Sequence, residues 1–250
     1  MAALLEMRDV HVSFSGFSAV AGLNLTVEQG ELRCLIGPNG AGKTTALDAI
    51  CGKARAAGGE ILYRDQDITG WQEYLIARLG IGRKFQVPSV FKDLTVRENL
   101  RVAYCKELGV FRNLASGQND DSVDGLEKLA ELVGLKDELH RPARQLSHGQ
   151  TQWLETALLL AQDAELILMD EPTAGMTSAE THKTAELFNR LKGRHTLIVV
   201  EHDMSFVREI GDRISVMHQG RILAEGKIAE IEQNPEVRRA YLGSGGISGA

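Results

Sequence analysis

A glycine-rich turn near the start of the chain has the residue types of a phosphate-binding loop. The segment Gly37-Pro38-Asn39-Gly40-Ala41-Gly42-Lys43-Thr44 matches the pattern G-x-x-x-x-G-K-[ST] at every fixed position. Such glycines let successive backbone N–H groups and the positive end of the following helix face an anion. We expect Lys43 to reach the β- and γ-phosphates of a nucleotide and the Thr44 hydroxyl to bind Mg²⁺, with Thr45 in the first helical turn.

The residues on both sides of this turn support the same interpretation. An apolar run at 32–36 precedes it, and residues 45–51 follow with helical spacing. The motif requires this passage from a strand to a helix. A chance glycine-rich turn that contains a lysine would not explain both flanks.

Two adjacent carboxylates follow a second apolar run. Residues 165–169 are continuously apolar after Glu165, as expected of a parallel strand covered on both faces, and Asp170 and Glu171 come next. Adjacent carboxylates are usually only solvated charge, but Pro172 restricts the turn that carries these two. Asp170 is expected to hold Mg²⁺ through water, and Glu171 to orient or deprotonate an attacking water.

Three further side chains are candidates for the same site. His202 follows the apolar run 196–200, at the sheet edge where ligands bind, and is expected to reach the γ-phosphate, although a lone histidine is more often structural. Gln86 ends another apolar run and is a candidate contact to the metal or the water. Phe14 follows the first alternating segment, where its ring would either stack on an adenine or pack beneath a loop.

Composition sets the class of protein. The chain has 250 residues, 43% of them hydrophobic and 25% charged, and a formal net charge of -6. This charge argues against non-specific binding of nucleic acid or anionic membranes, which favours a basic face. No apolar stretch approaches the roughly 20 residues of a membrane span, and the N-terminus lacks the pattern of a signal peptide, so we expect a cytoplasmic protein.

The order of the segments predicts one domain with an insertion. Alternating patterns at 4–14 and 23–27 predict early antiparallel strands. Residues 88–162 are mostly helical, with a capping box at Thr95 and Glu98, and residues 117–124 form a polar loop. We therefore expect a single domain over 1–242, with its core in 1–87 and 163–242, a helical subdomain in 88–162 and a flexible tail at 243–250.

The segment Leu146-Ser147-His148-Gly149-Gln150 completes a set of motifs. Together with the phosphate loop, Gln86, the 166–171 segment and His202 in this order, it resembles the ATP-binding cassette (ABC) ATPase family over nearly the whole chain. The resemblance implies an α/β P-loop fold with a mixed central sheet, an N-terminal antiparallel β subdomain and an inserted α-helical subdomain. It also implies that two ATP molecules lie between two subunits.

The resemblance also assigns roles to residues. Ser147, His148, Gly149 and Gln150 would form the signature that binds the γ-phosphate of a nucleotide on the opposite subunit, and the following helix N-terminus is compatible with an anion. Glu171 would be the catalytic base, His202 the switch histidine and Gln86 the link between metal and transporter. The implied ATP-binding residues are Phe14, Gly37, Pro38, Asn39, Gly40, Ala41, Gly42, Lys43, Thr44 and Thr45, and the Mg²⁺-binding residues are Thr44, Gln86 and Asp170.

Two positions depart from the family pattern. His148 stands where the signature usually has glycine, so its side chain must fit beside a nucleotide, point away or make a polar contact. Thr177 stands where an aspartate usually contacts the opposite phosphate loop. These departures suggest a subunit whose two composite sites are unequal and which pairs with a different ATPase chain.

Several motifs resemble the ATPases of branched-chain amino acid and urea or amide importers. Arg83-Lys84-Phe85-Gln86, the 146–150 segment and Gly175-Met176-Thr177 look most like the urea branch, so urea or short amides are the main reading and branched-chain amino acids the alternative. The resemblance implies a second ATPase subunit, identical or different, two integral-membrane permease subunits and, indirectly, a periplasmic solute-binding protein. It places the chain on the inner face of the plasma membrane, without nucleic acid.

Two other classes are weighed against the transporter. A non-transport ABC ATPase usually carries two cassettes, long coiled coils or basic arms, and the chain shows none of these patterns. A kinase-like phosphoryl transferase would use the same loop but would not explain residues 146–150.

Overall fold

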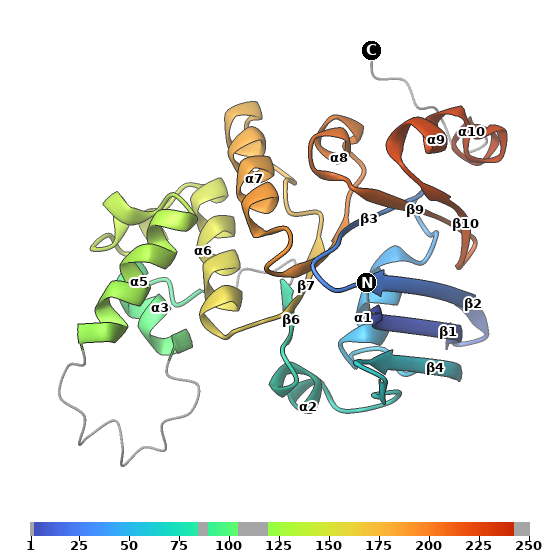
Figure 1. Ribbon diagram of the computed structural model, residues 1–250, viewed down its shortest axis with the longest axis horizontal. Coiled ribbons are helices and arrows are strands. Elements are labelled where there is room, and N and C mark those ends of the chain that lie inside the picture. Colours follow the sequence, from blue (N-terminus) through green and yellow to red (C-terminus); the bar gives the residue numbers. More distant parts are fainter. Residues whose placement is uncertain (1–2, 85–89, 105–119, 243–250) are drawn as a thin grey trace. The chain divides into compact units, whose positions relative to one another are not determined.

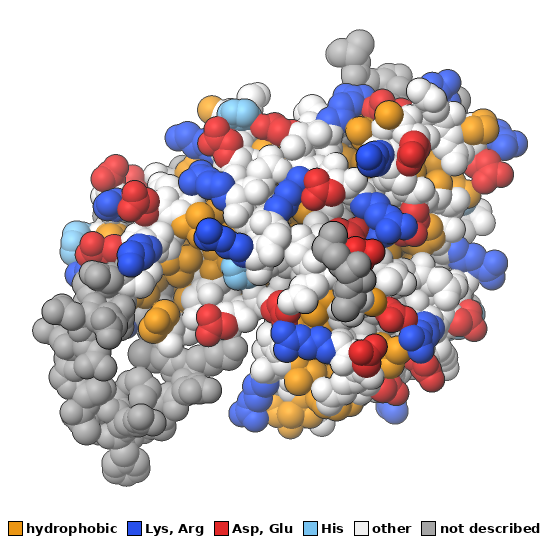
Figure 2. All heavy atoms as spheres, in the orientation of Figure 1, with side chains coloured by type: hydrophobic (Ala, Val, Ile, Leu, Met, Phe, Trp, Pro, Cys, Tyr) orange, Lys and Arg blue, Asp and Glu red, His pale blue; other side chains and the backbone are white. Residues whose placement is uncertain are grey.

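The computed structural model describes residues 3–84, 90–104 and 120–242, and these fall into two compact units. The first unit comprises Met1–Arg83, Glu165–Pro172 and Phe188–Ala250, and the second comprises Lys84–Ala164 and Thr173–Leu187. The division into a core at 1–87 and 163–242 and a helical subdomain at 88–162 stays a prediction. In the face shown in Figure 2, the described acidic and basic side chains are interspersed.

An antiparallel sheet begins the first unit, as the alternating sequence pattern predicts. Its strand order is β2-β1-β4-β5, and β1, β2 and β4 lie side by side in Figure 1. Buried and exposed side chains alternate at 23–27 of β2, as in a sheet with one face on the core, and register shifts interrupt the alternation in β1. The strands are β1 (Ala3–Phe14), β2 (Phe17–Glu28), β4 (Gly58–Tyr63) and β5 (Gln66–Asp67).

A six-stranded mixed sheet, in the order β10-β9-β3-β8-β7-β6, forms the centre of the fold. Strands β3, β7 and β8 are buried at every position, as the continuous apolar runs of β7 and β8 predict; β3 also contains Arg33, which is buried in ion pairs with Glu31 and Glu225. The pairs β3·β8, β3·β9 and β7·β8 are parallel, and β9·β10 is antiparallel. The strands are β3 (Leu32–Ile36), β6 (Ile81–Lys84), β7 (Leu166–Asp170), β8 (Thr196–Val200), β9 (Arg213–His218) and β10 (Arg221–Gly226).

Helices and an apolar core complete the first unit. The core joins side chains of both sheets to α1, with Val20, Leu47 and Ile198 among its fully buried members. Phe188 and Phe206 pack edge to face, with ring centroids 5.9 Å apart. The helices that lie wholly in this unit are α1 (Lys43–Ile50), α2 (Glu73–Arg78), α8 (Met204–Ile210), α9 (Ile228–Gln233) and α10 (Pro235–Leu242).

The second unit is helical, as the sequence predicts. Helices α3 and α5 both contact α6, whose apolar residues Leu154 and Ala157 are fully buried. The Trp153 indole N–H on α6 donates to the Thr184 hydroxyl on α7 at 2.9 Å. The elements are α3 (Val96–Tyr104), α5 (Asp120–Leu132), the 3₁₀ turns η1 (Lys136–Glu138) and η2 (Ala143–Gln145), α6 (His148–Ala161) and the first part of α7 (Ser178–Leu191).

Two details differ from the sequence predictions. Helix α5 begins at Asp120, inside the predicted polar loop 117–124, because aspartate and serine are compatible with the start of a helix and no glycine or proline lies between 118 and 124. The sequence predicted no structure after residue 224, whereas α9 and α10 follow β10. No helix in the described part of the chain has both the length and the apolar character needed to cross a bilayer.

Candidate functional site

The predicted phosphate loop lies between the end of β3 and the start of α1. Gly42 caps α1 in a left-handed conformation, with φ 99°, and no side chain caps this helix, so its first N–H groups can face an anion. Glycine is required at two points by close backbone approach. A Cβ at Gly42 would lie 2.4 Å from the Ala19 carbonyl oxygen, and one at Gly37 would lie 2.2 Å from that of Met217. Strands β2 and β9 therefore fix the shape of the loop.

The Lys43 side chain bonds the backbone of its own phosphate loop. Its ammonium donates to the carbonyl oxygens of Gly37 at 2.7 Å and Pro38 at 3.1 Å. Burial lowers the pKa of Lys43, and the negative charges of Glu171 and Asp170 oppose this shift. The structure thus brings the lysine and both predicted carboxylates into one electrostatic environment, where an anionic phosphate would replace the carbonyl oxygens as the lysine's partner.

Asp170 ends β7 as a buried carboxylate without a hydrogen-bond partner. The residue is 3% exposed, and neither carboxylate oxygen has a partner within hydrogen-bond distance. Burial raises the pKa of Asp170, while the Thr44 hydroxyl and the Arg83 guanidinium act in the opposite direction. An unpartnered carboxylate beside a threonine hydroxyl is a donor set that suits Mg²⁺.

The residues predicted to hold Mg²⁺ are Thr44, Gln86 and Asp170. Among the residues that the structure describes, no three His, Cys, Asp or Glu side chains form a metal-binding cluster. Mg²⁺ usually takes one or two carboxylates together with substrate phosphates and water, so Thr44 and Asp170 would suffice. Gln86, the third predicted ligand, lies outside the described residues.

Sequence reasoning missed that Arg83 and Asp48 form ion pairs next to Asp170. The Arg83 guanidinium lies 2.5 Å from Asp48 Oδ1 on α1 and 3.6 Å from Asp170 Oδ2 on β7. Its side chain is 5% exposed, so it brings a buried positive charge to the helix that begins at the phosphate loop. The residues are 35 positions apart, and no local pattern marks them as a pair.

Glu171 and His202 lie close together after β7 and β8. The Glu171 N–H donates to the Val200 carbonyl at 2.9 Å, and the Glu171 backbone is left-handed, with φ 48°. Such strain in a residue other than glycine often occurs at functional sites. Glu171 Oε1 lies 3.7 Å from His202 Nδ1, and the side chains are 41% and 67% exposed. Both side chains can therefore meet a ligand from solvent.

Phe14 lies at the tip of the hairpin formed by β1 and β2. It pairs with Phe17 across a two-residue turn and is 51% exposed, so it is not packed beneath a loop. Strand β2 continues from this tip to Ala19, which contacts the phosphate loop at Gly42. The ring is available for stacking on a base, and Phe17, 65% exposed, is a second aromatic side chain there.

The predicted signature begins α6 in the second unit. Ser147 is its N-cap, and it forms a capping box with Gln150: Gln150 N–H donates to Ser147 Oγ at 3.1 Å, and Ser147 N–H donates to Gln150 Oε1 at 2.9 Å. Gln150 thus has a structural contact at the helix start. Its predicted contact with a nucleotide stays a prediction.

His148 makes a polar contact within its own unit. Its Nε2 lies 3.0 Å from the Ala174 carbonyl oxygen, so this nitrogen carries the proton and donates. Of the three possibilities considered for the departure from glycine, the structure has the polar contact. The bond ties the signature to the segment that carries Gly175 and Thr177.

Thr177 immediately precedes α7 and caps it, at the position where the family usually has aspartate. Its N–H and its hydroxyl donate to Glu180 Oε2 at 3.0 and 2.9 Å, a T-x-x-E capping box. Glu180 also reaches the signature, because the Ser147 hydroxyl donates to Glu180 Oε1 at 2.9 Å. Sequence reasoning missed Glu180; the T-x-x-E spacing could have identified the cap but not its contact with Ser147.

The structure thus groups the predicted residues into two sets. The first unit brings together the phosphate loop, Asp170, Glu171 and His202, and the second unit contains residues 147–150 and Thr177.

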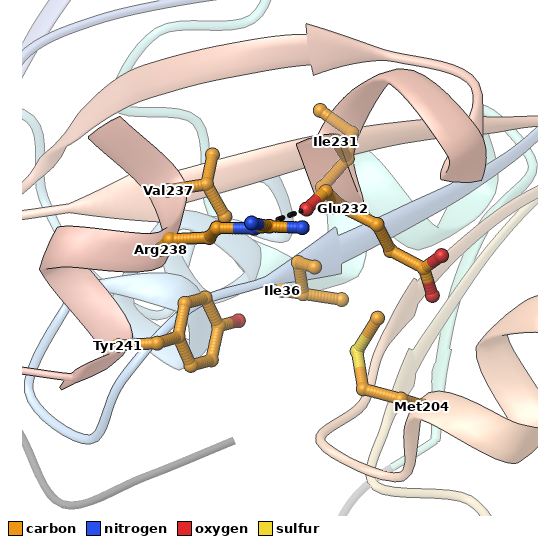
Figure 3. A pocket seen from close by; sticks show the side chains of 7 residues that line it. All are labelled: Ile36, Met204, Ile231, Glu232, Val237, Arg238 and Tyr241. Atoms are coloured by element: carbon orange, nitrogen blue, oxygen red, sulfur yellow. Dashed lines mark hydrogen bonds between the residues drawn. The ribbon is translucent and has the colours of Figure 1, made fainter. Parts of the chain in front are cut away.

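A small cavity elsewhere in the first unit has no part in this arrangement. It measures about 20 Å³, which is room for one water molecule. Figure 3 shows its lining, which comes from the end of β3, the start of α8, and helices α9 and α10: Ile36, Met204, Ile231, Glu232, Val237, Arg238 and Tyr241.

Comparison with known proteins identifies the family. The family model for the ABC transporter matches residues 20–174, and a model for the branched-chain amino acid ATP-binding cassette transporter matches residues 221–247. The chain is 39% identical over 249 residues to the high-affinity branched-chain amino acid transport ATP-binding protein LivG of Escherichia coli K12, covering 96% of this chain and 98% of that protein. It is 36% identical to the corresponding protein BraF of Pseudomonas aeruginosa, with the same coverage.

A solved structure agrees with this assignment. A crystal structure of an ATP-binding cassette of an ABC transporter in its ADP conformation matches with a TM-score of 0.84 and 29% identity, covering 97% of this chain and all of the other. The predicted fold class, a P-loop ABC ATPase with an antiparallel sheet, a mixed central sheet and a helical insertion, is confirmed. The chain therefore belongs to the ABC transporter family, as an ATP-binding cassette protein that uses ATP with Mg²⁺ and hydrolyses the ATP.

Proposed function

We propose that this chain hydrolyses ATP at a site completed by a second subunit and thereby drives an importer. The observation that supports it most is that the predicted residues belong to two different compact units: Lys43, Asp170 and Glu171 to one, and Ser147 to the other. The first unit has the cationic loop, whereas the second offers the Ser147 hydroxyl and helix N–H groups, which in this structure face the Glu180 carboxylate. A triphosphate that bridges two subunits would use both.

The chain's own residues then divide the reaction between them. Lys43 and the N–H groups of the loop bind the β- and γ-phosphates, and Phe14 stacks on the adenine. Thr44 and Asp170 would hold Mg²⁺, which would supply positive charge to offset that of the phosphates. Glu171 accepts a proton from the water whose oxygen attacks the γ-phosphorus, and the bond to the ADP oxygen breaks. His202, beside Glu171, donates a hydrogen bond to the γ-phosphate.

Closure of the two subunits depends on the γ-phosphate. ATP would contact both Lys43 of one chain and Ser147 and Gly149 of the other, whereas ADP is too short to reach the second chain. A ligand shifts a conformational equilibrium only by its differential affinity for the two states, so ATP favours the closed pair and its hydrolysis reopens it. Gln86 is proposed to link this cycle to the permease subunits.

We propose branched-chain amino acids as the transported solutes. The support comes from relatives named as branched-chain amino acid transport proteins, which align over nearly their full length and are 39% identical in one case, and from the family match at residues 221–247. The hypothesis that urea is the solute rests on residues 83–86, 146–150 and 175–177 alone and receives no support from these relatives. The proposed partners are a second ATPase subunit, two permease subunits and, indirectly, a periplasmic solute-binding protein, with the chain at the inner face of the plasma membrane.

Two substitutions test the ATPase mechanism. Glu171→Gln should keep ATP binding, reduce turnover by about 10²–10⁴-fold and trap an ATP-dependent pair, as seen by size-exclusion chromatography with light scattering. Ser147→Ala should keep ATP binding by the isolated chain and weaken the pair. Unchanged turnover in Glu171→Gln, or equal loss of ATP binding and pairing in Ser147→Ala, would contradict the assignment.

The solute is tested in the assembled transporter. Its ATPase rate, measured in membranes reconstituted with the binding protein, should rise with leucine, isoleucine or valine and remain at the basal level with urea. Stimulation by urea alone would restore the other reading.

A further inference from the structure

Glu180 is shared between a helix cap and the signature. Its Oε2 accepts the N–H and the hydroxyl of Thr177, which stabilises the start of α7. Its Oε1 accepts the hydroxyl of Ser147, 33 residues earlier in the chain. One carboxylate therefore joins the segment after β7 to the first turn of α6, within the second unit.

A second capping box in the same unit shows that the cap alone does not require this contact. At the start of α3, the Thr95 N–H and hydroxyl donate to Glu98 Oε2 at 2.8 Å each, the same arrangement as at Thr177 and Glu180. Among the described residues, Glu98 bonds only Thr95. The contact with Ser147 is therefore specific to Glu180.

The hydrogen bond from Ser147 to Glu180 uses the hydroxyl hydrogen that an anion bound at the signature, residues 147–150, would need. A serine hydroxyl has one hydrogen, and that of Ser147 points to Glu180, while the Gln150 N–H occupies a lone pair of the same oxygen. The same carboxylate lies against Gly149, where a Cβ would be 2.6 Å from Glu180 Oε1. Glu180 thus covers both Ser147 and Gly149.

The carboxylate remains charged at neutral pH in this position. The pKa of Glu180 is lowered, first by the Thr177 N–H and then by the Ser147 and Thr177 hydroxyls, with a smaller effect of the Gly149 N–H. A phosphate oxygen and this carboxylate would repel each other and compete for the same donors.

We propose that Glu180 is an internal anion that occupies the signature and must be displaced by the γ-phosphate of ATP held by the partner subunit. The proposal rests on the proposed function, which assigns Ser147 and Gly149 to that phosphate. Displacement needs only that Oε1 leave Ser147 and Gly149, and a rotated side chain can still meet Thr177. After hydrolysis no γ-phosphate remains, and Glu180 returns to Ser147, which favours separation of the pair.

The test compares Glu180→Gln with Glu98→Gln in the full chain, purified together with the ATPase subunit with which it pairs. The measured quantity is the ATP concentration that gives half-maximal hydrolysis. A neutral amide makes weaker hydrogen bonds than a carboxylate and does not repel phosphate, so Glu180→Gln should lower this concentration about tenfold. Glu98→Gln changes an equivalent cap away from the signature and should leave it unchanged.

A shorter acid gives an independent check. Glu180→Asp keeps the charge and a residue suited to the first helical turn, but it withdraws the carboxylate from Ser147, so it should also lower the ATP requirement. Circular dichroism and ADP binding confirm that each variant is folded with an intact phosphate loop. An ATP requirement that is unchanged or raised in both Glu180 variants would overturn the proposal.

A third variant, Ser147→Ala, distinguishes a failure of this proposal from a failure of the proposed function on which it rests. If Ser147→Ala leaves the ATP requirement unchanged, the assignment of Ser147 to the partner's γ-phosphate fails and Glu180 has no ligand to compete with. If Ser147→Ala raises the requirement while the Glu180 variants behave as wild type, the shared ATP site stands and only the role of Glu180 fails.

Discussion

Burial of the Asp170 carboxylate should lower the free energy of unfolding of the nucleotide-free protein. Burying a polar group without a hydrogen bond costs about 1–3 kcal/mol, and Arg83, 3.6 Å from Oδ2, offsets part of this cost. Asp170→Asn keeps the shape and removes the charge. We expect the free energy of unfolding to rise by about 1–2 kcal/mol, which corresponds to a Tm increase of about 2–8 °C for a chain of this size.

The pH dependence follows from the direction of the pKa shift. Because burial raises the pKa of Asp170 above its unfolded value, charging this group in the folded state is penalised, and stability falls as pH rises through the folded pKa. The gain from Asp170→Asn should therefore be present at pH 8 and smaller at a lower pH at which part of the wild-type carboxyl is protonated. With ATP and Mg²⁺ the sign should reverse, because the wild type alone retains the carboxylate that holds the metal.

Asp48 provides the matched control, since it reaches the same arginine with a close contact. Its Oδ1 lies 2.5 Å from the Arg83 guanidinium, so Asp48→Asn removes a charged partner from a buried cation and should lower stability by about 1.5–3 kcal/mol. The assay is thermal unfolding of the full chain in EDTA, followed by circular dichroism at both pH values. A lower Tm for Asp170→Asn in EDTA at pH 8 would refute the reasoning, since Arg83 and Thr44 would then stabilise the carboxylate by more than its burial costs.

Two further substitutions test the nucleotide contact and the core. Phe14→Ala should raise the Kd for ATP about tenfold, because the stacking contact with the adenine is lost. Phe17→Ala, on the same exposed hairpin, is the control and should change the Kd less than twofold. Equal effects of the two substitutions in equilibrium binding would contradict the role of Phe14. Glu225→Gln should lower the free energy of unfolding, measured in urea, by about 1–3 kcal/mol, because Glu225 lies 2.6 Å from the fully buried Arg33 guanidinium. Glu60→Gln, at an exposed site, is the control. Equal losses of stability in the two variants would contradict this reasoning.

Features carried by short stretches of chain were predictable. The phosphate loop needs only eight consecutive residues and its two flanks, and its glycines have the positive φ that the motif implies. The buried strands β7 and β8 follow from continuous apolar runs, and the Thr95–Glu98 cap from its spacing. In each case the physical cause acts between neighbours in the sequence, so a local pattern suffices.

The sequence by itself therefore determined the phosphate loop, the positions of Asp170, Glu171 and His202 at strand ends, and the family. Only the tertiary structure decided what these side chains contact: Asp170 is buried within ion-pair distance of Arg83 but without a hydrogen bond to it, and Ser147 bonds a glutamate 33 residues away. Burial and long-range hydrogen bonds depend on which strands and helices pack together, and residue types at fixed spacing do not record that choice. For this reason Glu180 is an ordinary helix cap in the sequence and an occupant of the signature in the fold.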